Sequence, residues 1–185
     1  MSDSHSMTNP SGGIEGRRRA TQPALHVALM EQVLAAANLR RAWARVKANR
    51  GAPGIDGMHI EDFAEFAREQ WVTIREHLSD GSYRPQPVRR VMIPKPGGGE
   101  RPLGIPTVVD RLIQQAIAQV LTPIFDPGFS ESSFGFRPNR SAHGALRQVQ
   151  AHIRVGYRIA VDLDLAKFFD NVRHDILMAR VARRV

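Results

Sequence analysis

Three aspartates lie within nine positions of the segment AVDLDLAKFFDNV, residues 160–172. Apolar and acidic residues alternate around Asp162 and Asp164, and this period of two is typical of a half-buried β-strand. Two carboxylates on one face of a strand repel each other unless a cation or an arginine neutralises them. A metal ion is one such cation. An ion pair with arginine, or a cap on the next helix, explains the same pattern.

A basic pair flanks a run of glycines in a second segment, PVRRVMIPKPGGGERPLGIP, residues 87–106. Two stretches separated by Gly97–Gly99 predict a β-hairpin, and their prolines restrict both strands to the edge of a sheet. Lys95 and Arg101 would project from one side of this hairpin, where they could bind a triphosphate. The alternative is a solvated hairpin tip. The GKS/T order of a P-loop is missing.

Aromatic and basic residues follow each other in a third segment, SSFGFRPNRSAHGAL, residues 132–146. Phe134 and Phe136 flank a glycine, and Arg137 and Arg140 come directly after them. Aromatic rings can stack on unpaired bases while arginines follow the phosphates. Phenylalanines at this spacing also occur in hydrophobic cores, so both interpretations stay open.

Composition restricts the class of protein. A chain of 185 residues with 42% hydrophobic residues is long enough to bury the core of one domain. It contains no cysteine, which excludes disulfides and thiolate zinc sites. No apolar run approaches the length of a membrane span, and the N-terminus lacks the order of a secretory signal. We expect a cytoplasmic protein without a membrane partner.

The charge balance points to an anionic partner. The formal net charge is +8, and of the 26 basic residues all but Lys47, Lys95 and Lys167 are arginines. The guanidinium group forms paired hydrogen bonds to phosphate oxygens, so an arginine-rich surface suits nucleic acid. Base composition of a genome can also favour arginine codons without any function, so the charge alone does not identify this partner.

Helices predominate among the elements that must position these residues. Apolar periodicity predicts helices over 25–49, with a break and N-cap at Asn38, and over 61–78. Further helices are expected over 108–121, closed by Pro123, over 141–155 with Ser141 as its cap, and from 175 onward. Residues 158–164 form the predicted strand, and 49–57 a tight glycine-shaped loop.

Several blocks in order resemble a known family. Three of them resemble the fingers and first palm strand of a reverse transcriptase of the group II intron-encoded, maturase type. These blocks are RRVMIPKPGGGERPLGIPTVVDRLIQQAIAQVL, SESSFGFRPNRSAHGAL and AVDLDLAKFFDNVRHDILM. NLRRAWARVKANRGAPGIDGMHIEDF resembles the N-terminal extension of those enzymes. The resemblance implies an α+β fragment of the right-hand polymerase fold. We divide it into a disordered basic tail (1–24), a helical N-terminal extension (25–80), the fingers (81–157) and a truncated start of the palm (158–185).

The resemblance also implies roles for single residues. Asp164 matches the first catalytic aspartate, a ligand of two Mg²⁺ ions, and Leu165 lies where the family offers a main-chain carbonyl to a metal. Lys95 and Arg101 match the pair that holds the incoming deoxynucleoside triphosphate (dNTP). Phe169 matches the aromatic gate against a ribose 2′-hydroxyl.

The remaining candidates are assigned more loosely. Asp170 is expected to cap the following helix, and Asp162 to be structural. The expected RNA contacts come from the hairpin and the third segment: Arg89, Arg90, Phe134, Phe136, Arg137 and Arg140. The partners implied are an RNA template or group II intron RNA, a DNA primer and dNTP.

One departure from the family pattern limits the expected activity. The family needs a second acidic pair, and Leu165–Val185 contains no Asp-Asp. We therefore expect this chain alone to be inactive in DNA synthesis. A second polypeptide that carries the rest of the palm and the thumb is one partner that would complete it. The main alternative is a non-catalytic module that binds intron RNA and assists splicing. A haloacid-dehalogenase phosphatase and the retron, diversity-generating and CRISPR-associated branches fit the motifs less well.

Overall fold

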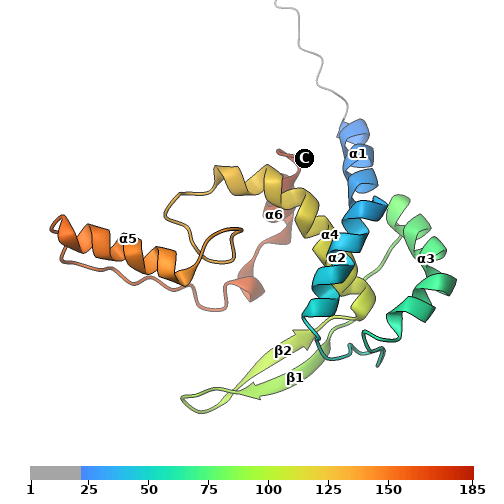
Figure 1. Cartoon of the computed structure of the whole chain (residues 1–185), viewed down its shortest axis with the longest axis horizontal. Coiled ribbons are helices and arrows are strands. Elements are labelled where there is room, and N and C mark those ends of the chain that lie inside the picture. Colours follow the sequence, from blue (N-terminus) through green and yellow to red (C-terminus); the bar gives the residue numbers. More distant parts are fainter. Residues whose placement is uncertain (1–21) are drawn as a thin grey trace, which may run out of the picture.

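The computed structural model describes residues 22–185 and shows a mixed α+β chain (Figure 1). The predicted disordered tail lies outside the described residues up to position 21, and a helix begins at the next residue. The elements in order are α1 (Gln22–Leu34), α2 (Ala36–Ala48), α3 (Phe63–Ser79), β1 (Arg89–Pro94), β2 (Glu100–Ile105), α4 (Val108–Phe125), η1 (Asp126–Gly128), α5 (Ala142–Arg154), η2 (Phe169–Asn171) and α6 (His174–Val181).

The hydrophobic core lies among the first four helices. Apolar residues at helical spacing bury one face of α4, and α2 packs along it. Ala42 of α2 and Ala116 of α4 are fully buried, and such small side chains let two helices approach closely. Trp43 joins α3 to this core, because its ring lies 4.4 Å from the ring of Phe63. The predicted helix over 61–78 is confirmed by α3, which begins two residues later.

The break between the first two helices is not where the sequence indicated it. The predicted N-cap at Asn38 is wrong, since α1 ends at Leu34 and Asn38 lies buried inside α2. Its side-chain amide donates 3.0 Å hydrogen bonds to the carbonyl oxygens of Val33 and Ala116, and its oxygen accepts a 2.7 Å bond from Gln119. A polar residue that looked like a cap therefore ties three helices together, because buried polar groups must be paired.

The end of α4 also differs from the expectation. The helix was expected to close before Pro123, but it continues to Phe125 with the proline inside its last turn. Proline has a helical φ, but it lacks the amide that would donate to the carbonyl oxygen four residues earlier, so the last turn of α4 forms without that hydrogen bond. The guanidinium of Arg184 lies 5.8 Å from the ring of Phe125, so the end of α4 also contacts the end of the described chain.

The predicted hairpin is confirmed. β1 and β2 are antiparallel, with Arg89 opposite Ile105 and Ile93 opposite Arg101. Because this sheet has two strands, both are edge strands and tolerate their prolines. The hairpin projects from the helical body with its glycine turn at the free end (Figure 1).

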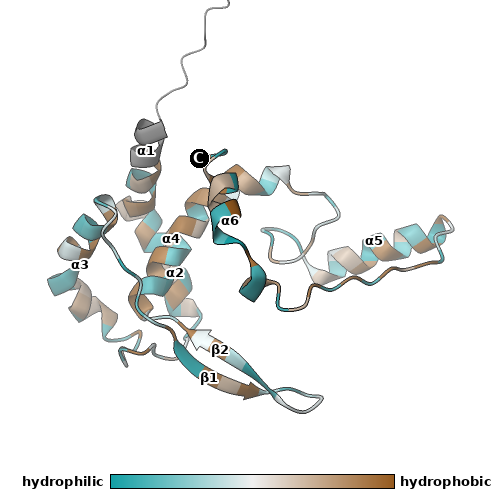
Figure 2. Cartoon of the chain, turned by 180° about the vertical axis from the view of Figure 1, so that it is seen from behind, coloured by the Kyte–Doolittle hydropathy of each residue, from teal (hydrophilic) through white to brown (hydrophobic). Residues whose placement is uncertain are grey.

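The predicted strand over 158–164 is wrong. Residues 157–165 are extended but have no strand partner, and all of them are exposed. A strand satisfies its backbone groups only through a neighbouring strand, and the hairpin is the one sheet among the described residues. Apolar and polar residues still alternate along the segment, which runs back beside α5 (Figure 2).

The last helices follow the prediction more closely. Ser141 caps α5, since its hydroxyl oxygen accepts a 3.2 Å hydrogen bond from the Gly144 backbone. α6 begins at His174, one residue before the expected start. Asp170 lies in η2 and does not cap α6, whose N-cap position is Arg173. In the described part of the chain, no helix is long and apolar enough to cross a membrane.

Candidate functional site

The hairpin tip brings two predicted site residues together. Ile93 and Arg101 are directly opposite each other, and Lys95 follows Ile93 by two positions, so Lys95 and Arg101 occupy the same face. Both residues are exposed. The Lys95 amide donates a 2.9 Å hydrogen bond to the Gly99 carbonyl oxygen, which closes the turn. The turn uses positive φ angles of 90° at Gly98 and 76° at Gly99, a conformation that favours glycine.

The other two hairpin arginines lie at its base. Arg89 begins β1 and is half-buried, whereas Arg90 is exposed on the opposite face. The Nε atom of Arg89 is buried without a hydrogen-bond partner among the described residues. Lys95 and Arg101 thus face solvent at the tip, while Arg89 lies against the protein.

A buried carboxylate holds the base of the hairpin. Asp110, in the first turn of α4, accepts hydrogen bonds from the Tyr83 hydroxyl (2.8 Å), the Thr107 hydroxyl (2.7 Å) and the Gln86 backbone amide (3.2 Å). The Asp110 amide donates in return to the Thr107 hydroxyl oxygen (3.1 Å). Burial, together with the bond to Asp110, raises the pKa of Tyr83 above its ordinary value. Tyr83 therefore stays a donor to the carboxylate.

The glycine-shaped loop at 49–57 meets the same end of α4. The Arg111 guanidinium donates a 3.0 Å hydrogen bond to the Ala52 carbonyl oxygen. Gly54 is buried against Thr107, where an added Cβ would lie 2.7 Å from the Thr107 Cα, so no side chain fits there. A cavity of about 1020 Å³ opens beside this loop, with Lys47, Arg50 and His59 in its lining.

The arginines of the third segment differ in their surroundings. Arg137 forms an ion pair with Asp126 (2.8 Å) and donates to the Ser130 carbonyl oxygen (2.7 Å). The hydrogen bond from Arg137 holds the pKa of Asp126 below its ordinary value. The guanidinium also lies 5.5 Å from the Phe129 ring. Arg137 is thus turned inward and shapes the loop.

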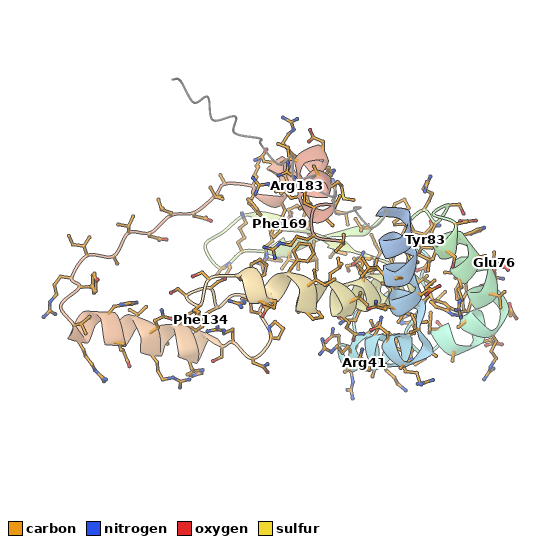
Figure 3. The ribbon with its side chains drawn as sticks, turned by 90° about the horizontal axis from the view of Figure 1, so that it is seen from above. Arg41, Glu76, Tyr83, Phe134, Phe169 and Arg183 are labelled. Carbon is orange, nitrogen blue, oxygen red and sulfur yellow. The ribbon has the colours of Figure 1, made fainter. Side chains whose placement is uncertain are left out.

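The aromatic residues of this segment face different environments. Phe134 lies near the start of α5 (Figure 3), against Gly144 in the first turn of that helix. The Arg140 guanidinium lies 5.5 Å from its ring. Phe136 is fully exposed and has a φ of 55°, a left-handed conformation that is rare for a bulky residue. Such a strained aromatic at the surface is a candidate contact for an unpaired base.

The predicted catalytic segment is exposed. Asp164 and Leu165 lie in the extended stretch without a strand partner, and Leu165 is 69% exposed. Phe169 in η2 is 86% exposed, and its ring lies 5.3 Å from that of Phe168. Among the described elements, η2 does not pack against β1 or β2. The structure therefore groups Lys95 with Arg101, and leaves Asp164, Leu165 and Phe169 apart from them.

The described residues offer only some of the ligands that a magnesium ion needs. Mg²⁺ takes six oxygen ligands, often carboxylates and waters, and the Asp164 carboxylate and Leu165 carbonyl are of the correct type. Residues 22–185, as described, bring no three histidine, aspartate or glutamate side chains together. The described chain supplies at most part of a magnesium site.

Sequence reasoning missed Asp110 and Tyr83. The sequence does contain a signal for one of these residues, because Thr107 and Asp110 have the spacing of a capping box at the start of a helix. That spacing predicts the Thr107–Asp110 pair, but nothing local shows that Tyr83 joins it from 27 positions upstream.

Comparison with known proteins gives one family model. The model described as "Reverse transcriptase (RNA-dependent DNA polymerase)" matches residues 93–184. This match includes the hairpin tip, the third segment and Asp164.

Several curated proteins are similar over most of the chain. "Protein YkfC" of Escherichia coli (strain K12) is 35% identical over 90% of this chain and 45% of its own length. "Group II intron-encoded protein LtrA" of Lactococcus lactis subsp. cremoris is 39% identical over 78% of this chain and 24% of its length. "Putative COX1/OXI3 intron 1 protein" of Saccharomyces cerevisiae is 32% identical over 80% of this chain and 17% of its own length. The chain thus spans less than half the length of each.

Proposed function

Since the chain belongs to the reverse transcriptase family, with the group II intron-encoded proteins and maturases as its relatives, we propose that it provides the fingers and first palm segment of an RNA-directed DNA polymerase. In this proposal the chain binds an RNA template with its DNA primer, and the hairpin binds the incoming dNTP. The proposed location is the cytoplasm.

The hairpin tip carries the proposal. Lys95, one residue beyond the end of β1, and Arg101 in β2 are both exposed on either side of a glycine turn, and strand alternation places them on the same face of the hairpin. Two cations at this spacing can neutralise the charge of a triphosphate and orient it. The glycines leave the turn without side chains, so the triphosphate can approach the backbone.

The other site residues have narrower proposed roles. Phe169 would pack against the sugar of the bound nucleotide, and Asp164 would contribute one carboxylate to the metal site. The divalent ions that this family uses stabilise negative charge during nucleotide transfer. They need more oxygen ligands than Asp164 and Leu165 provide. We therefore assign no catalytic step to the 185-residue chain alone and expect no DNA synthesis from it.

A second candidate function is RNA binding without catalysis. One observation favours it: α2 carries Arg40, Arg41, Arg45 and Lys47 and has no acidic residue. All four are exposed, as are Arg140 and Phe136. Such a surface suits an RNA backbone with an occasional unpaired base.

Two assays separate these functions. Fluorescence anisotropy measures the affinity of the chain for a labelled RNA–DNA template–primer at a series of salt concentrations. We expect this affinity to fall steeply as the salt concentration rises. Primer extension with Mg²⁺ and dNTP should give no product from the chain, or from its Asp164→Ala control. Extension that depends on Asp164 would overturn the expected inactivity, and salt-insensitive or absent binding would overturn both functions.

Lys95→Ala and Arg101→Ala test the dNTP role. In NMR titrations of ¹⁵N-labelled chain with dATP and Mg²⁺, we expect shifts of the Lys95–Arg101 amides that disappear in the double variant. Template–primer affinity should change little. If the double variant shows the same chemical-shift changes with dATP as the wild type, the hairpin does not bind the triphosphate.

A further inference from the structure

We propose that Asp110 is a positioning residue that fixes the direction of the β1–β2 hairpin relative to the helical body. The inference rests on the proposed function in one respect, because the hairpin direction matters most if Lys95 and Arg101 hold a triphosphate. The anchoring itself is a property of the described chain and can be tested without any ligand.

The anchor joins segments that are distant in sequence. Asp110 is 3% exposed, and its two carboxylate oxygens accept bonds from three donors. Two of these donors, the Tyr83 hydroxyl and the Gln86 amide, belong to the segment that leads into β1. The third, Thr107, lies between β2 and α4. The single carboxylate therefore holds the chain where it enters the hairpin and where it leaves.

The leading segment has little else to hold it. Residues 82–88 form no regular secondary structure, and among them only Tyr83 is half-buried, whereas the others are exposed. The Tyr83 amide also donates a 2.9 Å bond to the His77 carbonyl oxygen at the end of α3. Tyr83 thus links α3 through its backbone and α4 through its side chain.

The next residue of α4 fixes the neighbouring loop. Arg111 donates to the Ala52 carbonyl oxygen at 3.0 Å and, less closely, to the Thr107 carbonyl oxygen at 3.4 Å. The first turn of α4 thereby relates three elements to one another: the hairpin, the 49–57 loop and the core. A hairpin held this way presents its tip at a defined place relative to the loop.

Lever geometry explains why the anchor matters. Six residues of strand span roughly 20 Å, at about 3.3 Å per residue. A tilt of about 10° at the base therefore displaces the tip by roughly 3 Å. That displacement is as long as a hydrogen bond, so it separates a cation from its phosphate partner. An apolar residue could fill the Asp110 position, but it could not orient three donors.

The absence of cysteine from the chain allows a direct test. Spin labels are placed on Gly97→Cys, where a Cβ meets nothing within 4 Å, and on Gln114→Cys, an exposed residue of α4. Pulsed electron double resonance then measures the distance between the tip and the core. We expect a single narrow distribution that becomes at least about twofold broader with Tyr83→Phe, which keeps the ring and removes one donor.

A matched control is available in the only other tyrosine. Tyr157 is 66% exposed and outside the anchor, so Tyr157→Phe should leave the distribution unchanged. Asp110→Asn should broaden it further, with circular dichroism confirming that the variant still folds. Equal widths in wild type and Tyr83→Phe would overturn the proposal, and the mild variant keeps the test valid even where Asp110→Asn unfolds.

A second arm separates this inference from the proposed function. In a titration with dATP and Mg²⁺, the affinity of Tyr83→Phe for dATP should be roughly threefold to tenfold lower than that of the wild type. The reason is that a less ordered site loses more conformational entropy when the nucleotide binds. A broader hairpin without any dATP binding in wild type would leave the anchor intact and overturn the triphosphate role. An unchanged hairpin with weakened dATP binding would overturn the anchor.

Discussion

The two halves of the described chain use their apolar residues in opposite ways. Every buried hydrophobic residue lies between Val33 and Ala116, and none of the described residues after Ala116 is buried. From Phe129 to Met178, large apolar side chains are exposed instead, including Ile159 at 89% and Leu163 at 88%. Figure 2 shows that the arm formed by α5 and the extended segment carries apolar as well as polar residues and projects away from the helical body.

The contrast shows what an alternating pattern needs in order to become a strand. β1 and β2 form because a glycine turn brings the two strands directly against each other. The segment at 158–164 has a clear alternating pattern but no neighbouring strand, so its backbone stays unpaired and its apolar face exposed. Local pattern is sufficient for a hairpin and insufficient for a strand whose partner is distant in sequence.

The largest expected effect compares one leucine in each half. Leu112→Ala should destabilise the chain by about 3 kcal/mol, because it leaves a cavity in the core. Leu146→Ala, at a position of α5 that is 61% exposed, should cost less than about 0.5 kcal/mol. Urea unfolding followed by circular dichroism measures both. Equal losses would show that α5 belongs to the same cooperative unit as the core.

A smaller effect is expected at a pair of asparagines. Asn38→Ala removes three side-chain hydrogen bonds, to Val33, Ala116 and Gln119, and should cost about 2 kcal/mol, because these bonds join three helices in a largely buried place. Asn171→Ala removes exposed bonds to Ala166 and Lys167 and should cost less than about 0.5 kcal/mol. The same urea measurement applies. A neutral Asn38 variant would contradict the role of this residue as the link between α1, α2 and α4.

The smallest effect concerns pH and the second half alone. The pKa of Asp126 is lowered in the folded chain by Arg137, so the ion pair stabilises the loop above the ordinary aspartate pKa of about 3.9. This stabilisation is lost as the pH falls through the lower, folded value. The protection of the Arg137 Nε proton, measured as its hydrogen-exchange rate relative to that of free arginine at the same pH, should fall there, and Asp126→Asn should show low protection already at neutral pH. Protection that persists in Asp126→Asn would contradict the ion pair's role.

The sequence predicted a good part of the candidate site. The hairpin, its glycine turn and the shared face of Lys95 and Arg101 depend on neighbours in sequence, and the structure has all three. The surroundings of the third segment could not be predicted in the same way. Arg137 and Arg140 look equivalent in the sequence, but Arg137 pairs with Asp126, eleven positions upstream, and Arg140 stacks on Phe134. Asp164 keeps its proposed role, although its surroundings in the structure do not form a complete metal site.

By itself, the sequence determined the local elements and the family: the helical stripes, the Ser141 cap, the hairpin and the ordered motifs that match reverse transcriptases. Only the tertiary structure decided which polar groups are buried. Asn38 became a core link through partners 78 and 81 positions away, and Asp110 became the hairpin anchor through residues 24 and 27 positions away. The reason is physical: turns and caps are satisfied by neighbouring residues, whereas a buried polar group is satisfied by whatever the fold packs against it.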